Sequence, residues 1–141
     1  MVRDRLRDGR RIAQLLASEI EGDGGTLAEL SVIDADRDVD PTIDGALAYR
    51  VAIAGEPNGE TATADETIAE VYVHPDRIRV EFSVAPDRAA EAAGEAGLRV
   101  RPKAVRPPRT IVFVEDGAQV KWILPAFEAV LEAAGSATSS L

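Results

Sequence analysis

The most concentrated chemistry in the sequence is a block of basic side chains. Residues 98–114 carry five of them and no acidic one, although the whole chain has 25 acidic against 16 basic residues. Two further arginines lie on an earlier segment of alternating polar and apolar residues. The seven cations are Arg77, Arg79, Arg99, Arg101, Lys103, Arg106 and Arg109. Because a guanidinium donates paired hydrogen bonds to phosphate or carboxylate, the pattern predicts an anion-binding surface.

The same block has a simpler interpretation. Acidic residues prevail over 22–97, and the cations could neutralise them within the fold and protect the edge of a sheet. No aromatic residue lies between the cations of 98–109, which argues against a stacking platform for single-stranded nucleic acid. Affinity for phosphate also falls steeply with salt. The candidate partners are nucleic acid or an acidic protein, bound weakly at high salt. Pairing with the chain's own carboxylates stays open as the alternative.

Aspartates at alternate positions resemble the first half of a calcium-binding loop, and they are Asp34, Asp36, Asp38 and Asp40. Such a loop needs glycine at its sixth position and a bidentate glutamate at its twelfth. The residues at those positions are Val39 and Gly45. The sequence therefore predicts a solvated acidic loop, with no metal site and no cofactor.

Catalytic residues are not evident. His74 is the only histidine, and its position before Pro75 predicts a turn residue rather than a general base. The chain has no cysteine, no serine in a nucleophile elbow and no glycine-rich phosphate loop after a strand. We therefore expect a non-enzymatic interaction module. The alternative is a small hydrolase or metal-binding enzyme, whose carboxylates the sequence does not single out.

Helical and strand periodicities follow one another in a regular order. The patterns predict helices over 3–21, over 86–96 and from about residue 116, and strands within 30–32, 47–53, 67–73, 78–84, 98–103 and 110–114. A long polar hairpin loop is expected over 55–66. Asp116 and Gln119 have the spacing of a helix-capping pair.

The strand with the clearest alternation is the one over 78–84. Ile78, Val80, Phe82 and Val84 alternate there with polar residues, which is typical of a half-buried antiparallel strand. A strand of this kind needs cover on one face only. The sequence thus predicts an α+β fold, a two-layer sandwich with a mostly antiparallel sheet of five or six strands and helices on one face. Trp122 and Phe127 are expected in the core beneath the last helix, with a kink at Pro125.

Composition predicts the number of domains and the environment in which the protein works. With 141 residues, 45% of them hydrophobic, we expect one domain over 1–134 and a disordered tail over 135–141. A net charge of −9, with only two lysines, indicates a protein that works in concentrated salt. No signal peptide or membrane-spanning run is recognisable, so we expect a cytoplasmic protein without membrane contact. The oligomeric state stays open, a homodimer included.

Three segments resemble a family of small haloarchaeal proteins of unknown function. They are residues 5–14, 34–39 and 98–114, and the resemblance extends over most of 3–124. It implies a salt-rich source and carries no activity. The element order is also similar to that of small α+β modules of the YdhG-like and frataxin-like kind. The first helix here is rich in arginine, whereas the iron-binding helix of frataxin is acidic, so this second similarity implies a fold and no iron site.

Overall fold

The computed structural model describes residues 8–22, 27, 29–36, 38–53, 67–103, 105 and 108–139, with the side chains of 135–139 left aside. Within these residues the elements are α1 (Gly9–Gly22), β1 (Leu30–Ile33), β2 (Ala46–Ile53), β3 (Thr67–Val73), β4 (Ile78–Phe82), α2 (Pro86–Glu95), β5 (Arg99–Lys103), β6 (Arg109–Val114) and α3 (Gln119–Ser139). The predicted order of helices and strands is confirmed.

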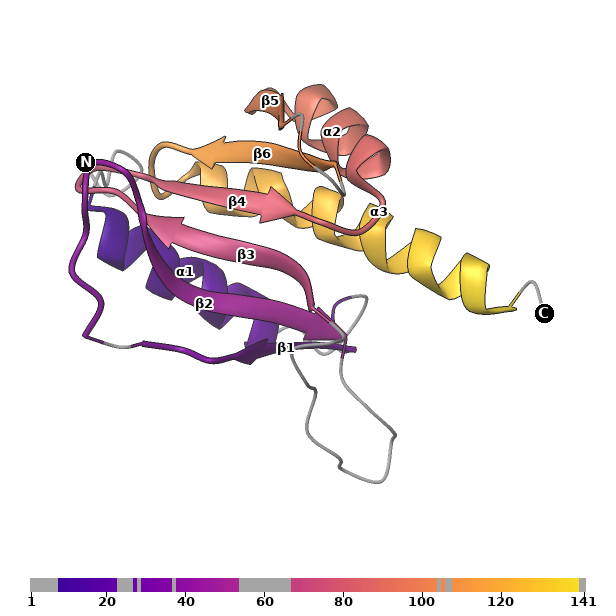
Figure 1. Ribbon diagram of the computed structural model, residues 1–141, viewed down its shortest axis with the longest axis horizontal. Helices are drawn as coiled ribbons and strands as arrows, with labels where there is room; N and C mark the ends of the chain where they lie inside the picture. The colour runs from indigo at the N-terminus through magenta and orange to yellow at the C-terminus, as the bar shows by residue number, and fades with distance from the viewer. Residues whose placement is uncertain are drawn as a thin grey trace.

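The described strands form one open sheet in the order β1-β2-β3-β4-β6-β5, and all neighbours are antiparallel. Figure 1 shows α1 and α3 behind this sheet, and α2 beside β5 and β6. No described helix covers the other face. The predicted α+β architecture, with helices on one face, is therefore confirmed. Among the described residues, no helix combines the length and apolar character that crossing a membrane requires.

The core lies between the sheet and the helices and consists mainly of Val, Ile, Leu and Ala. Ile78, Val80 and Phe82 on β4 are completely buried, as their alternation predicts. Phe82 packs against Phe127 of α3 with ring centroids 4.9 Å apart. A core of branched aliphatic residues suits a sheet, because their stiff side chains pack well on a pleated surface.

Local signals explain where two helices begin. Asp8 precedes α1, and its carboxylate accepts a hydrogen bond from the Arg11 backbone N–H at 3.3 Å. Before α3, the Asp116 carboxylate accepts from Gln119 N–H at 3.0 Å, while the Gln119 side chain accepts from Glu115 N–H at 2.8 Å. This reciprocal arrangement confirms the predicted capping pair.

The placement of one side chain differs from the prediction. Trp122 is 44% exposed, because the core-facing positions of α3 are taken by Val120, Ile123 and Phe127, and Trp122 lies to the side of that stripe. The expectation of a core Trp122 was wrong, whereas that of a core Phe127 is confirmed. On β2 there are two register irregularities, and Ala48 and Ala52 are buried as well as Tyr49 and Val51.

One predicted boundary lies within a helix, and two other predictions lie outside the described residues. Helix α3 continues across Pro125 and reaches Ser139, so the predicted domain boundary at 134 falls inside this helix. The first described helical residue is Gly9, and the predicted start at residue 3 lies outside the described residues, as does the hairpin loop expected over 55–66.

Candidate functional site on the uncovered sheet face

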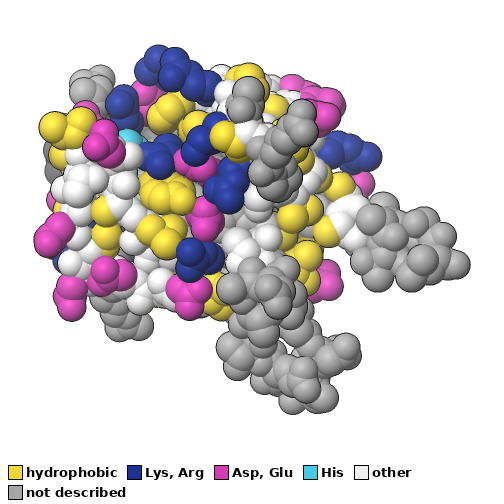
Figure 2. Space-filling view, in the orientation of Figure 1, with side chains coloured by type: hydrophobic (Ala, Val, Ile, Leu, Met, Phe, Trp, Pro, Cys, Tyr) yellow, Lys and Arg dark blue, Asp and Glu magenta, His cyan; other side chains and the backbone are white. Residues whose placement is uncertain are grey.

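Strand register places most of the charged strand residues on the face that no described helix covers, which we call the uncovered face. Six cations from four strands and two carboxylates from two strands meet there: Arg50, Arg79, Arg99, Arg101, Lys103, Arg109, Glu70 and Glu81. Figure 2 looks onto this face and shows basic, acidic and hydrophobic side chains interspersed over its middle. The basic block is therefore not a separate patch but part of a mixed surface.

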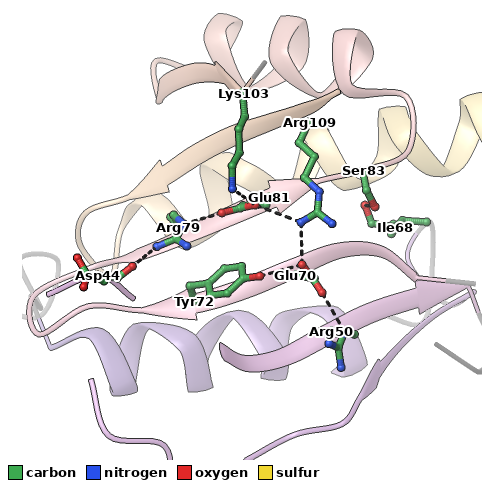
Figure 3. A network of polar contacts seen from close by, with 10 residues as sticks. All are labelled: Asp44, Arg50, Ile68, Glu70, Tyr72, Arg79, Glu81, Ser83, Lys103 and Arg109. Atoms are coloured by element: carbon green, nitrogen blue, oxygen red, sulfur yellow. Dashed lines mark hydrogen bonds and ion pairs between the residues drawn. The ribbon is translucent and has the colours of Figure 1, made fainter. Parts of the chain in front are cut away.

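The centre of this face is a carboxylate pair. Glu70 on β3 lies directly opposite Glu81 on β4. Like charges in that position repel unless a cation lies between them. Arg109 Nη1 donates to Glu70 Oε1 at 2.8 Å and to Glu81 Oε1 at 3.2 Å (Figure 3). The second carboxylate oxygens accept from Arg50 Nε at 3.0 Å and from Arg79 Nε at 2.7 Å, respectively.

Two more donors complete the pair's surroundings. The Tyr72 hydroxyl donates to Glu70 Oε1 at 2.9 Å, and Lys103 Nζ lies 3.4 Å from Glu81 Oε1. The Glu81 side chain is only 1% exposed. A buried carboxylate is stable only when its lone pairs are satisfied, and here Arg79, Lys103 and Arg109 satisfy them together.

Burial and hydrogen bonding act on these carboxylates in opposite directions. Burial alone raises the pKa of both, because desolvation penalises the charged form. Hydrogen bonds, led by those from Tyr72 and Arg109 at Glu70 and from Arg79 at Glu81, outweigh burial and lower the pKa of both groups. Both are therefore ionised at neutral pH, and neither is prepared to act as a general acid.

Arg79 also ties the network to the loop before β2. Its Nη1 donates to the Asp44 carbonyl oxygen at 2.7 Å and lies 3.2 Å from His74 Nε2. Since a guanidinium only donates, Nε2 is the acceptor, and the proton of the neutral ring is on Nδ1, which donates to the Ile43 carbonyl at 2.9 Å. Gly45 has a φ of 94° here, and a Cβ on it would collide with Arg79. These hydrogen bonds give His74 a structural role, which agrees with its prediction as a turn residue.

The cations of β5 have unequal surroundings. Arg99 contacts Glu115 at 3.1 Å, a carboxylate that also lies 3.9 Å from Arg77, and Lys103 contacts Glu81. Arg101 is exposed and makes no ion pair among the residues that the structure describes. Most described members of the predicted site thus pair with the chain's own carboxylates, while Arg101 does not. Arg106 lies outside the described residues. Whether the face binds an anion stays a prediction.

The sheet brings two aromatic residues next to the cations. Phe113 of β6 lies between Arg79 and Arg99 in the register. The Arg77 guanidinium lies 5.6 Å from the centre of the Phe113 ring, and that of Arg79 lies 4.2 Å from the Tyr72 ring. Both contacts are cation–π interactions. No aromatic residue lies between the cations of 98–109 along the chain, but in the sheet Phe113 lies beside Arg99.

Glu70, Tyr72 and Glu81 are absent from the predicted site, although a signal for them existed. The tight turn at Pro75–Asp76 was recognisable, and counting outward from it pairs Val73 with Ile78 and Glu70 with Glu81. The contribution of Arg109 could not be counted in this way, because α2 and β5 separate β4 from β6 in the chain.

Two hollows of the described structure lie apart from the carboxylate pair. One of them lies between α1 and the β1–β2 connection, and the other, of about 330 Å³, is lined by Asp76, Arg77, Glu115, Asp116 and Gln119. Neither is lined by Glu70 or Glu81.

The aspartate-rich loop does not form a cation cage in the described residues. Asp34 contacts Arg50 at 3.0 Å, and the Asp36 carboxylate accepts from the Asp38 backbone N–H at 3.0 Å. No group of three or more metal-binding side chains occurs among the described residues. Asp36 thus stabilises the loop, and Asp34 pairs with Arg50 at the margin of the uncovered face.

The sequence profile of a family of unknown function (DUF7993) matches residues 1–140. The chain belongs to this family. Comparisons with curated proteins and with solved structures found no match. Family membership supplies no ligand or reaction, so the chemistry of the uncovered face has to be argued from its geometry. The similarity in element order to YdhG-like and frataxin-like domains stays a prediction.

Proposed function

We propose that the protein is a non-enzymatic interaction module that uses β5 and β6 of its uncovered face to bind an acidic segment of another protein. The observation that carries this proposal is Arg101, an exposed cation without an ion pair among the described residues, in a chain with a net charge of −9. Ile111 lies beside it in the register and separates it from Glu81.

The neighbours of Arg101 suit a protein partner. Arg99 is on the same side of β5, with 70% of its side chain exposed. Phe113 and Ile111 are half-buried; Phe113 lies between Arg79 and Arg99 in the register, and Ile111 lies between Glu81 and Arg101. Arginine and aromatic side chains are enriched where proteins bind one another. A partner's carboxylate could accept paired hydrogen bonds from Arg101 without displacing an internal ion pair.

Nucleic acid fits this face less well. The rings of Tyr72 and Phe113 have arginines over them, so they are not free to stack on bases. Glu70 and Glu81 lie in the middle of the face, where they would repel a row of phosphates. The apolar side chains of the surface do not contribute to phosphate binding, but they increase the affinity for a protein. Salt does not weaken this apolar contribution.

A titration followed by NMR tests the proposal, with an oligoglutamate peptide and an oligothymidylate of equal net charge as probes. We expect the peptide to shift the amide signals of β5 and β6 and Arg99→Glu/Arg101→Glu to abolish this. The control Arg88→Glu/Lys121→Glu makes the same change of charge at exposed positions of α2 and α3, and it should bind as the wild type does. Peptide binding that survives Arg99→Glu/Arg101→Glu contradicts the proposal, and preference for the oligothymidylate assigns the face to nucleic acid.

From the composition, we also propose that the protein works in a salt-rich cytoplasm. The support for this is the excess of 25 acidic over 16 basic residues and the near absence of lysine. In concentrated salt the long-range repulsion between two acidic proteins is screened, and contacts at close range decide their affinity. Such conditions favour a mixed arginine and apolar surface over a purely basic one.

A further inference from the structure

The outer edge of β5 offers little backbone for a further strand. Pro102 pairs with Thr110 of β6 in the register, and proline has no N–H to donate to that neighbour. Residues of an antiparallel ladder alternate between pairs that exchange hydrogen bonds and pairs that do not, so the backbone of Pro102 faces outward, as is usual for proline in an edge strand. Leu98 agrees with this alternation, because its N–H donates to the Ala93 carbonyl of α2. Within β5 the edge therefore presents a single N–H, that of Val100.

This edge determines how a partner can be recognised. A protein segment that adds a strand to a sheet depends on a row of main-chain donors and acceptors. One N–H over the five residues of β5 cannot support such a ladder. Recognition at β5 therefore depends on the side chains of the uncovered face, where the exposed cations of this strand are Arg99 and Arg101.

These two arginines have a fixed spacing. They are two residues apart on one side of the strand, so they lie about 7 Å apart along it. Arg99 contacts Glu115 at 3.1 Å through one nitrogen, but a guanidinium has several N–H groups and keeps donors for a second carboxylate. On β6, Phe113 lies opposite Arg99 and Ile111 lies opposite Arg101. The face thus presents two cations, each beside a half-buried apolar side chain.

We propose that the acidic segment binds in an extended conformation along β5, with carboxylates at positions i and i+2. Side chains two residues apart on an extended chain point to one side and lie about 7 Å apart, which matches the spacing of Arg99 and Arg101. The aliphatic parts of two glutamates would lie over Phe113 and Ile111. A helix presents carboxylates on one side at i and i+4, and like charges at that spacing destabilise it. This inference rests on the proposed function and specifies its ligand.

Three capped peptides of equal length and charge test the spacing. The first has two glutamates at i and i+2 in a threonine and serine background, and the second has them adjacent in the same background. The third has them at i and i+4 in an alanine-based helix. Titration of the labelled protein at low salt, followed by NMR, gives a dissociation constant for each. We expect the first peptide to bind about three- to fivefold more tightly than the others, the effect of one additional exposed ion pair.

Two substitutions and a matched control locate the preference. Arg101→Gln breaks no ion pair among the described residues, and it should make the three peptides bind equally, because one of the two cations is lost. Arg88→Gln removes the same charge at an exposed position of α2 and should keep the preference. Pro102→Val restores an N–H at the edge and should leave the affinities unchanged. Tighter binding by this variant would show that the backbone takes part, and it overturns the proposal.

Failure of this inference is distinguishable from failure of the proposed function. Equal affinity of the wild type for the three peptides, or tightest binding of the second or third, overturns the extended i and i+2 arrangement and leaves an acidic partner in place. A preference for the first peptide that survives Arg101→Gln also overturns it. The proposed function itself fails if oligoglutamate does not bind at β5 and β6.

Discussion

At the scale of single residues, the position of Arg109 decides whether the half-buried carboxylate of Glu70 and the buried one of Glu81 can face each other. Its Nη1 is shared by Glu70 and Glu81, which lie opposite one another on adjacent strands. Each carboxylate also accepts hydrogen bonds from other donors. Arg109 differs from the remaining cations because it donates to both carboxylates. Cations elsewhere on the face could give the same total charge. Only a donor between Glu70 and Glu81 separates the two negative groups.

We predict that Arg109→Met lowers the free energy of unfolding by about 2 kcal/mol. Breaking a buried ion pair typically costs about 3–5 kcal/mol, and the smaller figure applies because the Arg109 side chain is 30% exposed. Urea denaturation at neutral pH measures the loss. Adding Glu70→Gln to the variant should recover at least half of it, since the repulsion then disappears. Arg101→Met serves as the control and should change stability little; an equal loss in both arginine variants would contradict the prediction.

The same pair predicts how stability depends on pH. The pKa of Glu70 and that of Glu81 are lowered from an ordinary value of 4.5. The unfolded chain therefore binds more protons in this range, and stability increases with pH. The contribution is complete above about pH 4.5 and is lost as pH falls through the lowered values. Urea denaturation between pH 3 and 7 should show this slope, and Glu70→Gln should reduce it. A Glu70→Gln variant with the slope of the wild type would refute the assignment.

At the scale of elements, the docking of α1 on the β3–β4 turn depends on one glycine. Gly9 donates its backbone N–H to the Pro75 carbonyl at 3.2 Å. A Cβ at this position would overlap the His74 carbonyl oxygen and lie 2.7 Å from that of Arg77. Both neighbours are backbone atoms of a tight turn, so neither can rotate away.

We predict that Gly9→Ala destabilises the protein by about 2–3 kcal/mol, the cost of forcing an extra methyl group into a packed contact. Gly94→Ala is the matched control, because a Cβ on Gly94 near the end of α2 meets nothing within 4 Å. That change should stabilise the helix by about 0.5–1 kcal/mol. Thermal denaturation of the two variants compares them directly, and equal effects would show that the contact at Gly9 is not rigid.

Elements were predictable to the extent that their signals are local. The alternation on β4, the capping pair before α3 and the turn at Pro75 each depend on neighbours in the chain, and each was confirmed. The lateral order of strands is not local: β6 lies between β4 and β5, and no pattern in 109–114 specifies that. The site could not be fully predicted for the same reason, because the contact of Arg109 with both glutamates depends on β6 lying beside β4.

At the scale of the whole molecule, the cations and the carboxylates are distributed differently. The uncovered face combines most strand cations with their own carboxylate partners, so its charges are largely neutralised. Elsewhere, exposed carboxylates such as Glu29, Asp40, Glu91 and Glu95 make no ion pair or hydrogen bond among the described residues. The net charge of −9 therefore falls mainly outside the network, where solvent ions reach it.

This distribution predicts that salt stabilises the protein. The Debye length falls from about 10 Å at 0.1 M to about 3 Å at 1 M, which screens repulsion between exposed carboxylates but affects the buried pairs much less. We expect the melting temperature to rise by about 10 °C between 0.1 M and 2 M KCl, which corresponds to about 2–3 kcal/mol for a chain of this length. Differential scanning calorimetry across that range measures the rise.

A variant with fewer exposed charges distinguishes screening from a general effect of salt on apolar burial. Glu29→Gln/Asp40→Asn/Glu91→Gln/Glu95→Gln removes four of the 25 acidic side chains without touching a described ion pair. If repulsion limits stability, this variant melts at a higher temperature than the wild type in 0.1 M KCl and gains less from added salt. If salt acts by strengthening apolar burial instead, both proteins gain equally. A flat melting temperature in the wild type would mean that the ion-paired face already offsets the repulsion, and that the acidic surface has no thermodynamic need for salt.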